Sequence, residues 1–196
     1  MSNPSVPWRL PARDKVGYNM REFLSTPREG TFVTDVKKIT PTIEDLRQQL
    51  RASRAAMLKP VIGLPETLLQ RERAVGPYSV AQHMAIRIEA ENRALTLAQS
   101  IYHGRPLLYP LSRETYDRKA VRMRWGWDWA HLMRELYQQR EETMWNLEDF
   151  RGPALHRRYD VHGQNLSPYE IFIGLAREEW ALSKALWGWR RSSLQG

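Results

Sequence analysis

The sequence contains no cysteine and no long apolar run. The lack of cysteine excludes disulfide bonds, thiolate metal ligands and a cysteine nucleophile, so a metal site would have to use histidines and carboxylates. No apolar run approaches the roughly 18 residues that a membrane-spanning helix needs, and we expect no membrane span. The first residues also lack the apolar segment of a secretory signal, which favours a cytoplasmic protein.

Positive charge, by contrast, is abundant. The 196 residues carry a formal net charge of +8, which makes nucleic acid a candidate partner. The basic residues are scattered, however, on the expected exposed side of one helix and in isolated pairs: Arg47, Arg51, Arg54, Arg157–Arg158 and Arg190–Arg191. We recognise no stripe of basic residues with interleaved aromatic residues, and we do not expect nucleic acid as a partner.

Residues 1–40 differ from the rest and form an N-terminal arm. Four prolines interrupt this segment, and its apolar residues lack a helical period. We expect one helical turn at about 19–24 and a short extended piece at 31–36, which cannot form a stable sheet alone. The arm is therefore expected to lie against the body or a neighbouring subunit.

Residues 41–192 show the spacing of amphipathic helices. Apolar residues three and four apart predict four long helices, at about 41–58, 80–103, 128–150 and 168–189. Short helices are expected near 63–69 and 112–123. With no credible core strand, the pattern indicates an all-α protein, an antiparallel four-helix bundle in which long connections after the second and third helices allow crossovers.

Two capping boxes place the helix starts. Ser79 is followed three residues later by Gln82, and Ser167 by Glu170, so that each pair can satisfy free backbone N–H groups at a helix start. Asp128 is the expected N-cap of the third long helix. The second helix is therefore expected to begin at Val80.

The order of elements resembles the DinB or YfiT-like superfamily of helical bundles. The matching features are a Gly-Leu-Pro-Glu segment at 63–66, an aromatic-Ser-Val turn at 78–80 and a last helix opened by Ser167-Pro168. The resemblance covers about residues 42–190 and leaves the arm unmatched. It implies a DinB-like four-helix bundle.

Metal-binding members of this superfamily hold a divalent ion such as zinc or nickel with one histidine in the second helix and a His-x-x-x-His pair in the last. The resemblance places these three positions at Ile86, Glu178 and Leu182. Isoleucine and leucine have no lone pair to donate, and the last helix contains no histidine. We therefore expect a divergent member without the metal triad, with no metal and no cofactor. A set of His83, Glu91 and Glu178 is the weaker alternative.

Glu178 is the one polar residue left at these positions, and its place in the core row of the last helix predicts a buried carboxylate. Such a group needs a partner or a proton. Arg140, Arg87 and His83 are the candidate partners. We expect a structural ion pair in place of the metal, the alternative being acid–base catalysis by Glu178, His83 and Arg140.

Six tryptophans could line a pocket or an interface: Trp125, Trp127, Trp129, Trp180, Trp187 and Trp189. These patterns, together with what the resemblance implies, leave three functions open. The first is a metal-free protein that binds a small molecule or a protein partner, without metal-dependent activity. The second is an enzyme of the same superfamily, of thiol S-transferase or hydrolase type. The third is a structural subunit that forms a homodimer or larger assembly through its arm and its Trp-rich surfaces.

Overall fold

The computed structural model describes residues 40–71, 73–105 and 112–193. These residues lie within one compact unit, Thr40–Gly196. Nearly all of the expected N-terminal arm, with its helical turn and its extended piece, falls outside the described residues.

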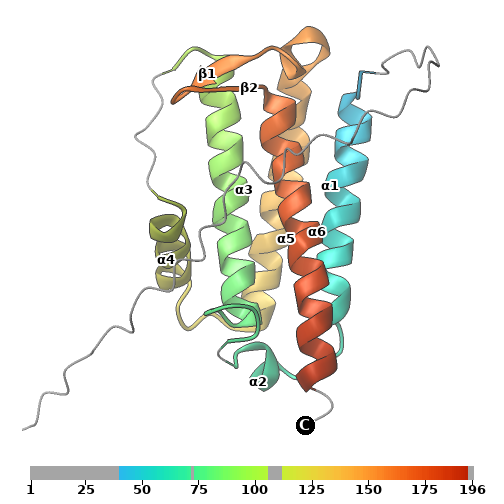
Figure 1. Cartoon of the computed structure of the whole chain (residues 1–196), viewed down its shortest axis with the longest axis vertical. Helices are drawn as coiled ribbons and strands as arrows, with labels where there is room; N and C mark the ends of the chain where they lie inside the picture. Colours follow the sequence, from blue (N-terminus) through green and yellow to red (C-terminus); the bar gives the residue numbers. More distant parts are fainter. Residues whose placement is uncertain (1–39, 72, 106–111, 194–196) are drawn as a thin grey trace, which may run out of the picture. The chain divides into compact units, whose positions relative to one another are not determined.

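Four long helices lie side by side and form the bundle (Figure 1): α1 (Ile43–Leu58), α3 (Val80–Tyr102), α5 (Trp129–Asn146) and α6 (Pro168–Ser193). α1 packs chiefly against α6, and α3 against α5 and α6. α1 and α6 run in one direction, α3 and α5 in the other (Figure 1). The all-α bundle expected from the sequence is confirmed, with a crossover between α3 and α5.

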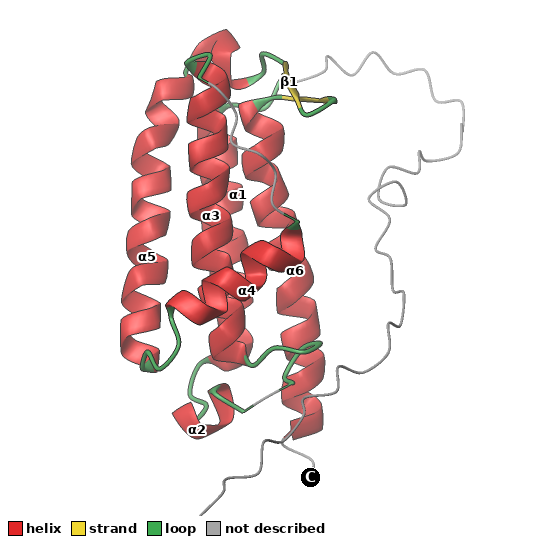
Figure 2. Ribbon diagram, turned by 90° about the vertical axis from the view of Figure 1, so that its left-hand side faces the viewer, coloured by secondary structure: helices red, strands yellow, loops and turns green. Residues whose placement is uncertain are grey.

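The shorter elements lie at the ends and on one face of the bundle. They are two short helices, α2 (Glu66–Leu69) and α4 (Arg113–Met123), and three 3₁₀ turns, Lys59–Val61, Leu147–Phe150 and Gly152–Leu155. Figure 2 shows α4 crossing α3 obliquely, with its first turn toward α6.

A hairpin of two short strands lies in the long connection that the sequence predicted after the third long helix. Strand β1 (Tyr159–Val161) pairs antiparallel with β2 (Gln164–Leu166). His162 and Gly163 turn the chain with φ of 52° and 80°, the backbone of a tight hairpin turn. The hairpin caps one end of the bundle rather than joining the core, so its strands lack the apolar alternation that predicts a buried strand.

The capping residues begin the helices as expected. The Ser79 hydroxyl accepts a hydrogen bond from the Gln82 backbone N–H at 3.1 Å, and the Gln82 side chain accepts one from the Ser79 N–H at 2.8 Å. Ser167 and Glu170 make the same pair of contacts at 3.2 and 2.8 Å. Thr42 forms a third box before α1. These contacts satisfy N–H groups that each helix start leaves free.

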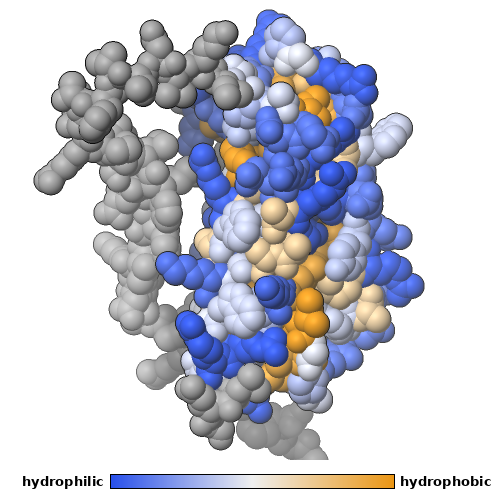
Figure 3. All heavy atoms as spheres, turned by 90° about the vertical axis from the view of Figure 1, so that its right-hand side faces the viewer, coloured by the Kyte–Doolittle hydropathy of each residue, from blue (hydrophilic) through white to orange (hydrophobic). Residues whose placement is uncertain are grey.

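The core consists of two apolar clusters, one toward each end of the long helices. The first contains Met57, Val80, Met84, Ile88, Leu136 and Leu186, and the second Leu46, Leu50, Leu147, Phe150 and Phe172. Between the clusters, each long helix contributes a charged side chain to the interior. On the α1 side of the bundle, hydrophilic side chains border a narrow apolar band (Figure 3). None of the described helices combines the length and the apolarity needed to cross a membrane.

Candidate functional site

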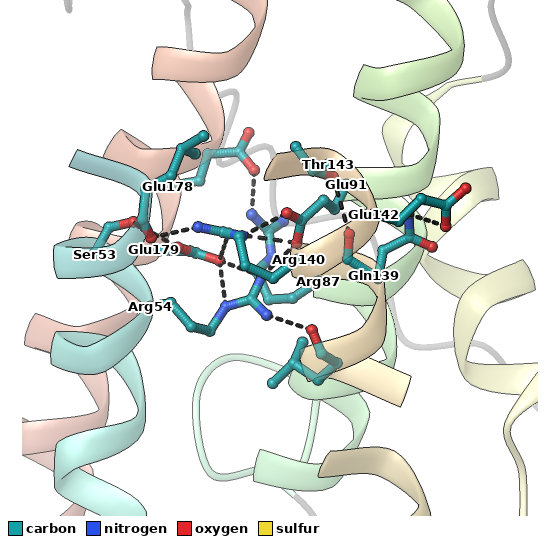
Figure 4. Close-up of polar contacts among 12 residues, drawn as sticks. Ser53, Arg54, Arg87, Glu91, Gln139, Arg140, Glu142, Thr143, Glu178 and Glu179 are labelled. Carbon is teal, nitrogen blue, oxygen red and sulfur yellow. Dashed lines mark hydrogen bonds and ion pairs between the residues drawn. The ribbon is translucent and has the colours of Figure 1, made fainter. Parts of the chain in front are cut away.

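Four charged side chains meet at the centre of the bundle, one from each long helix (Figure 4). They are Arg54 of α1, Glu91 of α3, Arg140 of α5 and Glu179 of α6, none more than 4% exposed. Arg54 donates to Glu179 at 2.8 Å and to Glu91 at 2.5 Å. Arg140 donates to the same two carboxylates, at 2.8 and 2.5 Å. We call these four residues the buried ionic layer.

The remaining polar atoms of this layer also have partners. Arg54 donates to the backbone carbonyl of Leu136 at 2.8 Å, and Arg140 to that of Leu50. The Ser53 hydroxyl donates to Glu179 at 2.6 Å. Burial opposes the charge on Arg54, but the two carboxylates outweigh it and raise the pKa of its guanidinium. The layer is neutral as a whole, hydrogen-bonded and closed to a substrate, which makes it a structural element.

A second polar cluster reaches the surface where α3, α4 and α6 meet. Glu178 of α6 accepts hydrogen bonds from Arg87 of α3 at 2.5 Å and from Arg113 of α4 at 3.0 Å. The guanidinium of Arg93 lies 4.6 Å from the ring centroid of Tyr116, a cation–π distance. The Arg113–Glu178 contact links α4 to α6. We call Arg87, Arg93 and Arg113 the arginine cluster.

Four groups on this side of the bundle have shifted pKa values. Burial raises the pKa of Asp117, although arginines oppose it, and burial together with Asp117 raises the pKa of Tyr78. Burial lowers the pKa of His83, and the positive charge of Arg87 lowers it further. Burial alone would raise the pKa of Glu178, but Arg87 and Arg113 reverse the direction and lower it. Shifted pKa values gather at functional sites, which makes this face the candidate site.

A small cavity lies between α3 and α4 beside the arginine cluster. Its volume is about 10 Å³, the space of about one water molecule. It is lined by Ile86, Arg87, Glu89, Ala90, Arg93, Arg113, Tyr116 and Asp117. Anything larger must displace a lining side chain, and Arg113, exposed on α4, is the one with room to move.

The positions that the resemblance assigns to a metal do not suit one. Ile86 and Leu182 are buried at 4% and 9% exposure and donate no lone pair. Glu178 is held by two guanidinium groups. Within the described ranges, no group of three or more histidines and carboxylates is placed to hold a metal ion. The residues present therefore do not fit the superfamily's metal centre.

The structure does not bring the three predicted catalytic candidates together. Glu178 pairs with Arg87, one of its predicted partners. The His83 ring nitrogen Nε2 makes a hydrogen bond with the Val75 carbonyl at 2.9 Å. Arg140 belongs to the buried ionic layer. Of the two neighbouring glutamates of α6, Glu179 is the fully buried one, and Glu178 points about 100° away from it around the helix.

Sequence reasoning missed half of the buried ionic layer. Arg54 was expected on the exposed side of its helix, and this was wrong. It lies four residues after Leu50 and three before Met57, which is the spacing of the buried row. That spacing was a usable signal, but an arginine in an apolar row is ordinarily assigned to the surface.

No family model matches the sequence, and no curated protein matches it either. Solved structures do resemble it. An uncharacterised protein from Escherichia coli UTI89 matches with a TM-score of 0.68 and 12% identity, over 79% of this chain and 96% of that one. An uncharacterised protein from Clostridium difficile 630 matches with a TM-score of 0.64 and 12% identity, over 81% and 98%.

A third match is the colibactin self-resistance protein ClbS, solved in complex with double-stranded DNA. Its TM-score is 0.64 at 14% identity, over 76% of this chain and 94% of ClbS. The fold is shared. At such low identity the likeness extends to the fold alone. Because ClbS was solved with DNA, the comparison lends no support to our expectation that nucleic acid is not a partner.

Proposed function

We propose that this chain is a divergent DinB-like bundle that works without a metal and binds a small molecule carrying a carboxylate or phosphate at the arginine cluster. The shared fold and the sequence features at 63–66 and 78–80 support the superfamily. The lack of a metal and the binding of an anionic ligand are inferred from the contacts of the arginine cluster.

One observation carries the proposal: arginines take the place of a cation beside Glu178. Of the three positions that would hold a metal, two are apolar, and the third is a carboxylate bound by Arg87 and Arg113. A guanidinium binds carboxylate and phosphate groups in the same planar, two-pronged way. A ligand anion can therefore compete with Glu178 for the same donors.

The charge balance of the cluster favours an anion. Arg87, Arg93 and Arg113 outnumber Glu178 and Asp117, and burial raises the pKa of the Asp117 carboxyl. The third carboxylate of the cavity lining, Glu89, lies within ion-pair distance of Lys119 and Arg124, which offset its charge. Net positive charge at a partly desolvated site attracts anions more strongly than the same charge in water. The ligand would enter as the Arg113 side chain swings outward.

Acid–base catalysis is less well supported than binding. The lowered pKa of Glu178 leaves it ionised at neutral pH, so it lacks the proton that a general acid must deliver. His83 is occupied by the Val75 carbonyl, and Arg140 is buried. The arginine cluster is therefore better suited to binding an anion than to acid–base catalysis.

Elemental analysis of protein purified without a histidine tag tests the metal-free part. We expect less than a tenth of an equivalent of zinc or nickel per chain. The triple variant Ile86→His/Glu178→His/Leu182→His provides a positive control, because it restores the donors that the resemblance assigns. One equivalent of metal in the unaltered protein would overturn the proposal.

Thermal unfolding with inorganic phosphate, citrate or phenyl phosphate tests the ligand part. Each anion that binds should raise the Tm of the unaltered protein and of Arg118→Gln, an exposed α4 arginine outside the cluster. The same anions should not raise the Tm of Arg113→Gln or Arg87→Gln. Equal stabilisation of all four proteins would mean that the anions act by general screening of charge, and it would contradict the proposed binding site.

A further inference from the structure

The exposed face of α6 carries a regular alternation of basic and tryptophan residues. Arg177, Trp180, Lys184, Trp187 and Arg191 follow one another at spacings of three, four, three and four residues. The three basic side chains are exposed, and Trp180 and Trp187 are 46% and 37% exposed. We call these five residues the basic–tryptophan stripe. It corrects our conclusion from the sequence that no basic stripe with interleaved aromatic residues exists.

The spacing fixes the geometry of the stripe. Residues three and four apart lie on one side of a helix, so all five side chains follow a single line. Basic residues recur every seven residues, as do the tryptophans, and seven helical residues rise about 10.5 Å. The line runs on the side of α6 next to α1, where the Ser183 hydroxyl donates to the Ala56 carbonyl at 2.7 Å.

The charge of the stripe is uncompensated. Within the described ranges, no carboxylate pairs with Arg177, Lys184 or Arg191. The carboxylates of α6 are engaged elsewhere: Glu170 with Arg158, Glu178 with the arginine cluster and Glu179 with the buried ionic layer. Lys59, in the 3₁₀ turn that follows α1, is also exposed, and its neighbour Pro60 accepts a hydrogen bond from Arg190 of α6 at 2.7 Å. This unpaired positive charge favours a polyanion as the partner of the surface.

We propose that the basic–tryptophan stripe binds single-stranded nucleic acid. Indole rings offer stacking faces for unpaired bases, and the basic side chains between them pair with phosphates. The regular alternation places one cation on either side of each tryptophan. Bases in a duplex are stacked on one another, so the tryptophans favour a single strand over a double helix.

Other occupants fit the stripe less well. Residues 1–39 contain seven basic and four acidic residues, and a second copy of the chain is itself strongly basic, so both would be repelled. A membrane surface would need a continuous apolar face. The apolar residues of α6, such as Leu175 and Leu186, instead face the core.

Fluorescence anisotropy with the full chain tests the proposal. The probes are labelled dT15, rU15, a 15-base-pair duplex and vesicles containing anionic phospholipid. Trp180→Ala/Trp187→Ala should weaken single-strand binding by at least about tenfold, since stacking contributes roughly 1–3 kcal/mol per base. For single strands, each phosphate contact contributes roughly 0.7 to the slope of log affinity against log salt. Arg177→Gln/Lys184→Gln/Arg191→Gln removes three such contacts and should therefore make this slope shallower by about 2.

Two matched controls separate the stripe from general effects. Trp125→Ala/Trp145→Ala removes tryptophans that are more exposed, at 75% and 79%, but lie elsewhere. Arg118→Gln/Lys119→Gln/Arg122→Gln makes the same change of charge on α4. Both controls should bind dT15 as the unaltered protein does, and circular dichroism checks that each variant folds. The proposal would be overturned if the protein did not bind dT15 or rU15, or if it preferred the duplex or the vesicles. It would also be overturned if the control variants lost as much affinity for dT15 as the stripe variants.

Discussion

Two neighbouring glutamates of α6 have different surroundings. Glu179 is 1% exposed and is hydrogen-bonded to Ser53, Arg54 and Arg140. The Glu178 side chain is 35% exposed, and one of its two arginines is itself exposed. A surface ion pair is screened by water, whereas an unpaired charge in the interior is not. The same substitution at the two positions should therefore have unequal effects.

Glu179→Gln should lower the free energy of unfolding by about 3–5 kcal/mol, because it leaves a guanidinium uncompensated in the core. Glu178→Gln, the adjacent control, should lower it by about 1 kcal/mol or less. Urea unfolding of the two variants measures the difference. Equal losses would mean that the layer is not insulated from solvent.

His83 should make stability depend on pH in a defined direction. Its pKa is lowered in the folded chain from 6.5, so the unfolded chain takes up a proton first as the pH falls. The full stability is present above pH 6.5, and part of it is lost between that value and the folded pKa.

In urea unfolding at pH 7.5 and 5.5, the unaltered protein should lose more stability on acidification than His83→Gln. Carboxylates titrate in both proteins, so the difference between them isolates the histidine. An identical pH dependence of stability in the two proteins would show that folding does not lower the pKa of His83.

At the scale of the element, the helix starts and the long helices were predictable from local sequence. Ser79, Asp128 and Ser167 cap α3, α5 and α6 as expected, because a cap is decided by residues three apart. The partners within the core are a different matter. Whether Glu178 or Glu179 faces the interior depends on the rotation of α6 against its neighbours.

The candidate site shows the same division. The sequence indicated that Ile86 and Leu182 cannot bind a metal, since that follows from side-chain chemistry alone. The link between Arg113 and Glu178 joins residues 65 apart in the chain, which no local pattern can reveal. The basic–tryptophan stripe, in contrast, is visible in the sequence itself, where basic residues and tryptophans each recur every seven residues.

Ser79→Ala should lower the free energy of unfolding by about 1 kcal/mol through loss of the cap of α3. Ser79→Thr should restore most of it, because threonine keeps the hydroxyl that accepts from Gln82. Ser192→Ala, at the far end of α6, serves as the control. Thermal and urea unfolding measure the effect, and a threonine variant no better than alanine would contradict the role of the hydroxyl.

At the scale of the whole molecule, the described residues from Ile43 onward already form both apolar clusters among themselves. The body therefore contains its own core. We expect a chain beginning at residue 40 to unfold in urea in one transition with an unchanged midpoint. A large fall in the midpoint would show that residues 1–39 contribute to the core.

Light scattering of the same truncated chain addresses the proposed assembly role of the arm. If the arm mediates a homodimer, the full chain should have twice the mass expected of one copy, and the truncated chain should not. An equal number of copies in both would end that proposal and leave the Trp-rich surfaces as the alternative.

The buried ionic layer also restricts how the four helices can slide along one another. A shift of α1 or α5 by a single turn, about 5.4 Å, would set its arginine against apolar side chains and bring a leucine or methionine to the opposing carboxylates: Leu50, Leu58, Leu136 or Met144. Leucine-rich helices alone would tolerate such a shift, because one apolar contact resembles the next. The charged residues therefore specify one axial alignment of the helices. Removal of one of them is costly because its partner stays buried and unpaired, whereas replacement of the whole layer by apolar side chains would cost little stability but would lose this alignment.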